Sequence, residues 1–509
     1  MKRFFLMPFF ILSVVMVSYS QQITYSDPVR EDNNTINFDI IGRVGNNIIV
    51  FKNAQSKYAV GVYDNAMQLK QKVDLDFMPG KSFNVDYVAY PYFFYLIYQY
   101  QKKGIEYCMA AKLNADGQLL KAPFEIDTTK IDLFDDNRIY NTIASEDKQH
   151  ILIYKSQKQN DQLNFETILL DSGFNVINKS RPSISFDDRR EICNNFLLDN
   201  NANFIFTKSI KAGNKENISN IDLVTKSSSA VTFSEKNISL DNNYADEVKL
   251  KIDNLNKRYI IHSFYYNKRN GDIIGLFVDI WDKPGDTSIA KVFVSLSDSV
   301  KAIVNADVKI KAALDNFFIR DVVVKKDGGF IITAEDHSIQ SNNLNNPWNR
   351  WNYLYGNPFM SPFGSYYFSP FSPYYSIYRP FGSSYYGNQS IRYYYNNILV
   401  TAFDNNGNLQ WNTVIHKSQY NDNDENSLSY LAFITGSEVH YLFNQFEKKD
   451  ELLYDNSITP SGQLKINPSI KPRAKAYEFM PRYGKQIGAK KIVVPCTYRN
   501  SICFALIEY

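Results

Sequence analysis

The sequence predicts an all-β fold built from repeated four-stranded units. Apolar and aromatic runs of about five to eight residues recur along the chain between Asn, Asp and Gly, and their content of Ile, Val, Tyr and Phe is typical of β-strands. Helical patterns, with apolar residues every three or four positions, are nearly absent. One turn motif also returns at regular intervals. A repeat architecture therefore explains the length of 509 residues without several separate domains.

The repeated turn motif contains an Asp or Asn, replaced by Thr459 in the last copy, and in most copies a Gly a few positions later. The Asp or Asn side chain can accept hydrogen bonds from the backbone of the turn, and Gly can adopt a positive φ. Each motif therefore marks a hairpin between two strands. The motifs span residues 63–69, 113–119, 170–173, 281–285, 403–409 and 458–464, and Ile221-Asp222 is a degraded copy.

Each motif joins the third and fourth strands of a predicted four-stranded meander. In the first unit these strands are 39–44, 47–52, 57–63 and 69–76. The units are predicted to begin near residues 38, 85, 138, 192, 247, 318, 428 and 476, which makes eight. The unit near residue 192 is weakly marked, so seven units is the alternative.

The two ends of the chain decide between an open array and a closed ring. The last unit contains three strands, around 477–481, 490–498 and 501–509, whereas residues 22–29 form a spare strand before the first unit. If the spare strand completes the last sheet, no edge is left exposed and the ring is closed. The sequence therefore predicts a single β-propeller domain over residues 21–509, with two stacked β-sandwiches as the alternative.

Residues 1–20 have the three parts of a secretory signal peptide. A basic start is followed by an apolar run over 4–17, and the small residues Ser18 and Ser20 occupy the positions that a signal peptidase recognises. The apolar run of about 14 residues is shorter than the roughly 20 that a spanning helix needs. We therefore expect an exported protein, periplasmic, outer-membrane-associated or extracellular, without a transmembrane segment after cleavage.

The charges of the chain are nearly balanced. There are 56 Lys and Arg against 53 Asp and Glu, and two of the basic residues lie in the predicted signal peptide. This balance gives no electrostatic reason to expect nucleic acid or an anionic membrane as a partner.

An aromatic segment within the sixth unit differs from the rest of the chain. From Trp348 to Tyr395, 19 of 48 residues are Phe, Trp or Tyr, and no Lys, Asp or Glu occurs from Ser338 to Phe403. Frequent Pro, Gly and Ser oppose a regular helix or a central strand. The sequence therefore predicts an insertion over residues 338–396.

Three interpretations of this insertion stay open. Tyr, Trp and Arg are the residue types that dominate protein interfaces, so the insertion could bind an envelope protein. Its rings could instead stack on a glycan, or could only cover apolar surface of the propeller. The candidate partner-binding residues are Trp348, Trp351, Tyr353, Tyr355, Tyr366, Tyr367, Tyr374, Tyr375, Arg379, Tyr385 and Tyr386.

The sequence contains no recognisable catalytic, cofactor or metal motif. The five His form no H-E-x-x-H pair, no Ser lies in G-x-S-x-G, and the acidic run 421–426 lacks the Gly and Glu of an EF-hand. We therefore predict no cofactor and a non-catalytic binding or scaffold protein of the bacterial cell envelope. The alternative is a propeller-type carbohydrate-binding or carbohydrate-active enzyme acting in the central funnel.

Two of the four cysteines are predicted to face each other. If Arg499-Asn500 forms a two-residue turn, Cys496 lies opposite Cys503 across the last hairpin. An exported chain can carry disulfides, so this pair is a possible disulfide, with two buried free thiols as the alternative.

A second sequence pattern covers the sixth and seventh units, over residues 328–464. A D-x-x-G-x-x-x-W motif is followed by an Ile-x-Lys-x-Gln element and then by a strand that ends in Asn. The residues concerned are Asp404, Gly407, Trp411, Ile415, Lys417, Gln419 and Asn444. This pattern resembles a group of uncharacterised secreted bacterial proteins with propeller-like, quinoprotein-type repeats. The resemblance implies a propeller fold and no particular activity.

Overall fold

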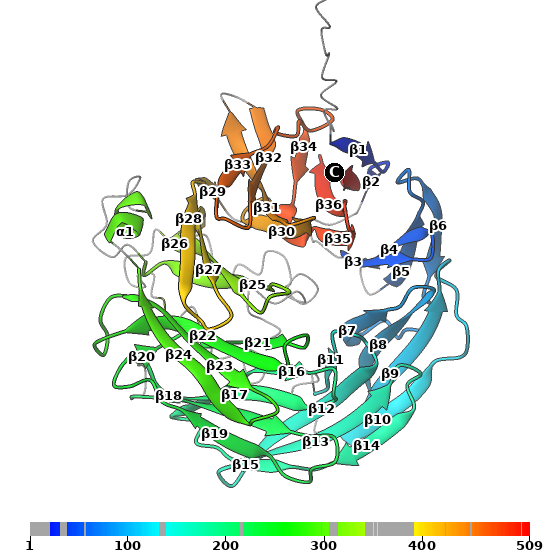
Figure 1. The fold of residues 1–509 in the computed structure, drawn as a ribbon. Coiled ribbons are helices and arrows are strands. Elements are labelled where there is room, and N and C mark those ends of the chain that lie inside the picture. Colours follow the sequence, from blue (N-terminus) through cyan, green and yellow to red (C-terminus); the bar gives the residue numbers. More distant parts are fainter. Residues whose placement is uncertain are drawn as a thin grey trace, which may run out of the picture.

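The structure, a computed structural model, describes residues 21–30, 38–54, 57–131, 139–213, 217–296, 298–304, 314–341, 350, 354, 391–422, 424–447, 450–499 and 501–509. The described strands form eight successive antiparallel blades arranged in a ring (Figure 1). The prediction of an all-β propeller is therefore confirmed. The predicted signal peptide lies outside the described residues, and no helix in the described part of the chain is long and apolar enough to span a membrane.

Each blade uses consecutive strands, counted outward from the axis of the ring. Blade 1 contains β3 (Phe38–Val44), β4 (Asn47–Ala54), β5 (Lys57–Tyr63) and β6 (Leu69–Asp74); blade 2 contains β7 (Ser82–Ala89), β8 (Phe93–Lys102), β9 (Ile105–Asn114) and β10 (Phe124–Lys130). Blade 3 contains β11 (Asn141–Ala144), β12 (His150–Gln159), β13 (Gln162–Asp171) and β14 (Val176–Ser180), with β15 (Ser183–Ser185) beside β13; blade 4 contains β16 (Glu191–Leu198), β17 (Phe204–Lys211), β18 (Ile218–Lys226) and β19 (Ser234–Ile238).

The second half of the ring follows the same plan. Blade 5 contains β21 (Lys249–Asp253), β22 (Arg258–Tyr266), β23 (Gly275–Asp282) and β24 (Thr287–Ser295); blade 6 contains β25 (Phe317–Val324), β26 (Phe330–Ser341), β27 (Ile391–Phe403) and β28 (Leu409–Ile415), with β29 (Gln419–Asp422) beside β27. Blade 7 contains β30 (Tyr430–Thr435), β31 (Glu438–Glu447), β32 (Asp450–Ile458) and β33 (Leu464–Ile466). Blade 8 contains β34 (Tyr477–Phe479), the 3-10 helix η1 (Pro481–Tyr483), β35 (Lys485–Gly488), β36 (Lys491–Tyr498) and β37 (Ser501–Glu508). The helix α1 (Asp298–Val304) lies in the connection from blade 5 to blade 6.

Blades 4 and 5 are joined into one nine-stranded sheet. The short strand β20 (Tyr244–Ala245) pairs with both β18 and β22, so hydrogen bonding continues from one blade to the next. The sheet still contains two complete meanders, β16 to β19 and β21 to β24. The weakly marked fourth unit is therefore a full blade, and the count is eight rather than seven.

The N-terminal strands close the ring in blade 8. β1 (Gln22–Tyr25) and β2 (Val29–Arg30) both pair antiparallel with β37. Between them, the backbone N–H of Ser26 donates to the Phe504 carbonyl at 2.9 Å, and the Phe504 N–H donates to Ser26 Oγ at 3.0 Å. The predicted closure by the N-terminal strand is confirmed.

The repeated turn has one local geometry. In the turn of blade 6, Asp404 Oδ1 accepts the backbone N–H groups of Asn406 and Asn408, both at 2.8 Å. In blade 5 the positive φ falls on Asp286, four positions after Asp282, whereas in blades 1, 2, 3 and 6 the residue three positions after the Asp or Asn has it. It is a Gly in blades 2 and 6, as the sequence predicts, but Met67 in blade 1 and Phe174 in blade 3. The expectation that Gly173 supplies the positive φ is therefore wrong, because position three after Asp171 is Phe174.

The residue with positive φ also fills the joint between two blades. Met67 is fully buried in a cluster with residues of blade 8, and the ring of Phe174 lies 3.9 Å from that of Tyr95 in blade 2. At the Gly462 turn of blade 7 the preceding blade fills the space, because a Cβ on Gly462 would lie 2.5 Å from the Trp411 ring. The turns therefore pack the blades together as well as joining strands.

Replacing Gly462 with Ala should lower the free energy of unfolding by about 2 to 5 kcal/mol. The positive φ costs about 1 to 2 kcal/mol for a residue with a Cβ, and the contact with Trp411 adds an overpacking cost of about 1 to 3 kcal/mol. Gly436 is the matched control, since its φ is also positive but a Cβ there meets nothing within 4 Å. Urea unfolding measures both variants, and equal losses would contradict the role of Trp411.

The aromatic insertion is shorter than predicted and leaves blade 6 between its second and third strands. Residues 338–341 and 391–396 belong to β26 and β27, and Ser341 lies opposite Ile391. The sequence placed these residues in the insertion because the region without Lys, Asp or Glu begins at Ser338 and the aromatic content continues to Tyr395. They form strands instead because they contain no Pro or Gly, pair with each other, and on the β27 side also pair with β29.

Cys496 and Cys503 are neighbours across the last hairpin, as predicted. Tyr498 lies opposite Ser501 and Cys496 opposite Cys503, and the two Sγ atoms are 2.6 Å apart. Both thiols are free in the structure. Disulfide formation stays a prediction, which thiol labelling of the unfolded protein can test.

Candidate functional site

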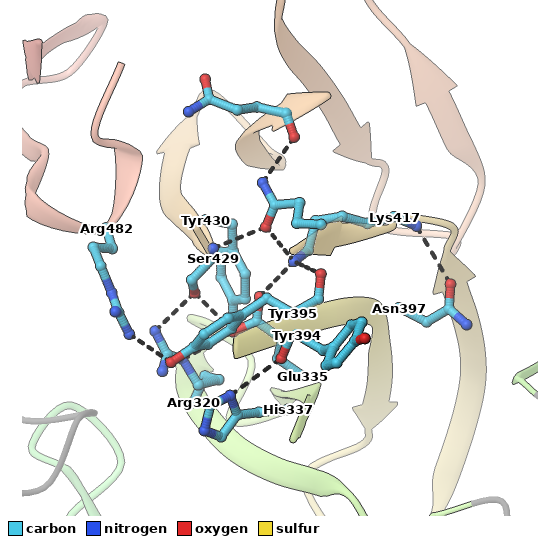
Figure 2. A network of polar contacts seen from close by, with 12 residues as sticks. Arg320, Glu335, His337, Tyr394, Tyr395, Asn397, Lys417, Ser429, Tyr430 and Arg482 are labelled. Atoms are coloured by element: carbon cyan, nitrogen blue, oxygen red, sulfur yellow. Dashed lines mark hydrogen bonds and ion pairs between the residues drawn. The ribbon is translucent and has the colours of Figure 1, made fainter. Parts of the chain in front are cut away.

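A buried polar network joins blades 6, 7 and 8 on their inner side (Figure 2). Its central ion pair links Lys417, which follows β28, to Glu335 on β26: Nζ lies 2.8 Å from Oε1, and both side chains are 0 % exposed. The ammonium also donates to the Tyr395 carbonyl at 3.0 Å and to Gln419 Oε1 at 2.8 Å. All three N–H groups of Lys417 therefore have acceptors.

The other oxygen of the Glu335 carboxylate is also bound. Ser429 Oγ donates to Glu335 Oε2 at 2.7 Å, and Arg320 Nε on β25 lies 3.5 Å from the same oxygen. Burial by itself raises the pKa of Glu335, but the charges of Lys417 and Arg320 outweigh it and hold the pKa below its usual value. The carboxylate therefore stays ionised inside the protein.

A second part of the polar network reaches blade 8. The Tyr395 hydroxyl donates to Glu425 Oε1 at 2.9 Å and accepts a hydrogen bond from Arg482 at 3.0 Å, while Arg482 lies 3.5 Å from the Glu425 carboxylate. These residues come from β27, from the start of blade 7 and from η1. The polar network therefore pairs its acids with its bases and connects three blades.

Three residues of the sequence pattern found above meet in this polar network. Gln419 Nε2 donates to the Asn444 carbonyl at 2.7 Å, and the Asn444 amide donates to the Phe479 carbonyl of blade 8 at 2.7 Å. With Lys417, they carry hydrogen bonds from blade 6 through blade 7 to blade 8. The Ile-x-Lys-x-Gln element therefore serves blade-to-blade contact.

Arg350, within the aromatic segment, is docked between blades 5 and 6. Its guanidinium forms an ion pair with Asp246, lies 3.5 Å from Glu247 Oε2, and donates to the Phe317 carbonyl. It also lies 4.2 Å from the centre of the Phe318 ring, and its side chain is only 12 % exposed. The beginning of the insertion is therefore fixed on the inner strands of these two blades.

The predicted partner-binding residues, from Trp348 and Trp351 to Tyr386, all lie outside the described residues. The sequence did not single out Arg350, although it is one of very few charged residues in the aromatic segment, which is the signal that could have found it. It also missed Tyr420 and Phe446, which are 60 % and 70 % exposed near the root of the insertion.

The root of the insertion carries a described aromatic and charged surface. Arg392 at the start of β27 forms two hydrogen bonds with the Asp422 carboxylate of β29, at 2.7 and 2.9 Å. The same guanidinium lies 4.7 Å from the centre of the Tyr420 ring. Tyr420 in turn lies opposite Tyr394 in the β27–β29 pair. This surface is held in place by strand pairing, while its rings remain open to solvent.

A third group of ionisable residues lies where blades 8, 1 and 2 meet, on β35, β3 and β7. Lys485 donates to the Tyr87 hydroxyl at 2.6 Å, and Tyr87 in turn lies 3.4 Å from the Asp39 carboxylate. Burial raises the pKa of Asp39 to about 6 and that of Asp86 to about 8. In the described part of the chain, no group of three or more His, Cys, Asp or Glu side chains is arranged to hold a metal ion.

Replacing Asp86 with Asn should raise stability at pH 8 relative to the native protein. The folded pKa of about 8 lies above the ordinary value of about 3.9, so the stabilising effect of the protonated acid is complete below about pH 4 and is lost as the pH rises towards 8. Urea unfolding at pH 5 and pH 8 measures this loss. Asp86→Asn should lose less stability between the two values, and an unchanged pH dependence would contradict the raised pKa.

No protein-family model and no curated protein matches the chain. Solved structures do match. Prolyl oligopeptidase B from Galerina marginata is 10% identical with a TM-score of 0.39, and the match covers 94% of this chain and 56% of that chain. The polysaccharide lyase Uly1 is 9% identical with a TM-score of 0.39, covering 83% and 89%. The β-propeller domain of the trilobed protease from Pyrococcus furiosus is 8% identical with a TM-score of 0.36, covering 82% and 91%.

These likenesses are remote, and the chain spans little more than half the length of the prolyl oligopeptidase it matches. Sequence identities and TM-scores this low do not indicate what the chain does. The assignment of a β-propeller fold rests on the strand order of this chain itself.

Proposed function

We propose that the protein is an exported, non-catalytic binding or scaffold protein of the bacterial cell envelope. It contacts an envelope partner through the aromatic insertion and the adjoining face of the propeller. The observation that carries this proposal is the anchoring of the insertion. Arg350 holds its start on blades 5 and 6, while Tyr420 and Phe446 expose their rings near its root.

The exposed rings lie on the face of the propeller from which the insertion leaves. The second strand of every blade runs in the same direction, so β26 and β31 end at the same face. The insertion leaves β26 at Ser341, and Phe446 lies at the corresponding end of β31. Tyr420 lies on β29, which pairs with the beginning of β27. Exposed aromatic side chains beside an Arg are the composition of protein interfaces, which supports a docking surface here.

The two acids of the buried polar network support binding over catalysis. A carbohydrate-active enzyme needs two carboxyl groups on opposite sides of its substrate. Glu335 instead forms an ion pair with Lys417 inside blade 6, and Glu425 forms one with Arg482 of blade 8. Such pairing fits a rigid frame that presents a surface.

The experiment compares capture of envelope components by three proteins. One is the intact chain, one has residues 355–388 replaced by a short Gly/Ser linker, and one carries Tyr420→Ala with Phe446→Ala. The linker variant keeps Arg350, because its loss would leave Asp246 and Glu247 without their buried counter-charge. Its melting temperature should change by only a few degrees, since loop-closure entropy depends weakly on loop length.

We expect the intact chain to capture a partner, the linker variant to lose it and the double variant to bind more weakly. Tyr92→Ala is the matched control, because this ring is 79 % exposed in the turn between β7 and β8, on the opposite face. A linker variant that keeps every partner would overturn the proposal. Release of sugar products from envelope polysaccharide by the intact chain would favour the carbohydrate-active alternative.

A further inference from the structure

A small cavity lies between blades 3 and 4, on the face opposite to the insertion. Its volume is about 20 Å³, and a water molecule needs about 10 to 15 Å³ of such space. Leu152, Leu169 and Phe204 form apolar walls, and Lys226 at the end of β18 lines the same cavity. The cavity therefore has room for about one water-sized particle beside the Lys226 side chain.

Lys226 is buried without an acidic partner among the described residues. The residue is 6 % exposed, and its ammonium makes one hydrogen bond, to the carbonyl of Ser227 at 3.3 Å. Lys208 in the same blade is equally buried at 6 %, but it lies 3.6 Å from Asp222 and pairs with Glu235. The two lysines therefore differ in counter-charge rather than in burial.

The two lysines also differ in the direction of their pKa shifts. Burial lowers the pKa of Lys226, and no nearby charge opposes it. Burial acts on Lys208 in the same direction, but Glu235 and Asp222 outweigh it and raise the pKa. An ammonium in a protein interior is costly unless an opposite charge compensates it. Lys226 lacks such a charge in the protein itself.

We propose that this cavity is a binding site for a small monovalent anion of halide size, with Lys226 as its counter-charge. Thr167, Ser180 and Ser228 line the same cavity, and the hydroxyls of Thr167 and Ser180 share one hydrogen bond at 2.7 Å, which leaves the proton of one of them as a further donor. A polyatomic anion such as sulfate is too large for a space that takes about one water. The site lies on other blades and on the other face from the surface proposed to bind a partner, so either proposal can fail without the other.

The experiment measures the melting temperature in potassium bromide and in potassium gluconate at the same ionic strength. Gluconate is too large to enter the cavity. Because the ionic strength is the same, general screening by salt is equal in the two solutions. We expect the native protein to melt about 2 to 4 °C higher in bromide, because a ligand that binds only the folded state stabilises it. Lys226→Met should melt at the same temperature in both salts.

Lys208→Met is the matched control. It removes a buried lysine that already has its counter-charges, so it should be less stable in both salts but keep the bromide effect. A crystal soaked in bromide gives an independent measurement, with an anomalous peak within hydrogen-bond distance of Lys226 Nζ in the native protein. Equal melting temperatures for the native protein in the two salts, or bromide bound only elsewhere, would overturn the proposal.

Discussion

Replacing Lys417 with Met should lower the free energy of unfolding by about 3 to 5 kcal/mol, because it leaves a buried carboxylate without its main counter-charge. Glu335 is 0 % exposed and lies 2.8 Å from the Lys417 ammonium. The remaining groups around it, Ser429 and Arg320, compensate only part of that charge. Urea unfolding at pH 7 measures the loss.

Two further variants separate the charge from the packing. Adding Glu335→Gln to Lys417→Met removes the unpaired carboxylate while keeping an acceptor for Ser429, but it also takes an ion-pair partner from Arg320, so it should recover only part of the lost stability. Lys465→Met breaks an exposed pair with Glu438, where the lysine side chain is 48 % exposed, and should cost less than about 1 kcal/mol. If Lys417→Met costs as little as Lys465→Met, Lys417 is not the main counter-charge of Glu335.

The turns could be predicted from the sequence because their chemistry is local. Asp404 binds the backbone two and four residues further along, so one short segment contains the whole signal. The spacing of such turns placed the first strand of every blade within a few residues of its observed start. Even in these turns, the residue with positive φ follows from its position in the turn and not from its type. In blade 3 that residue is Phe174 and not Gly173.

The polar network could not be predicted in the same way. Glu335 and Lys417 lie in the same blade but are far apart in the sequence, and Arg482 belongs to blade 8. A buried charge has no periodic signature in one sequence, and its partner is set by how blades pack. Only the resemblance in the sixth and seventh units pointed to Lys417 and Gln419, without indicating what they bind.

The surface beside the insertion could not be predicted from the sequence for a different reason. Composition marked the aromatic segment as a whole, but Tyr420 and Phe446 are single aromatic residues in ordinary strands. Their exposure follows from their places on β29 and at the end of β31. Without the blade arrangement, neither ring could be distinguished from a core residue.

Removing residues 21–30 should destabilise the whole ring by at least about 5 kcal/mol. Ile23 and Tyr25 pack against the core shared by blades 7 and 8, and burial of a large side chain contributes about 1.5 to 3 kcal/mol. Each hydrogen bond between β1 and β37 adds about 1 kcal/mol. The loss also uncovers the edge of β37, so we expect a lower melting temperature and self-association in size-exclusion chromatography.

A peptide of residues 21–30 tests whether the effect comes from the strand itself. Added to the shortened chain, it should restore the melting temperature, because a free strand can add to an exposed sheet edge. The same peptide with Ile23→Asp and Tyr25→Asp should fail, since it keeps the backbone donors but not the apolar contacts. A shortened chain that melts at the native temperature without any peptide would mean that the ring is held by blade packing alone. β1 would then be an attachment to a ring that is already closed.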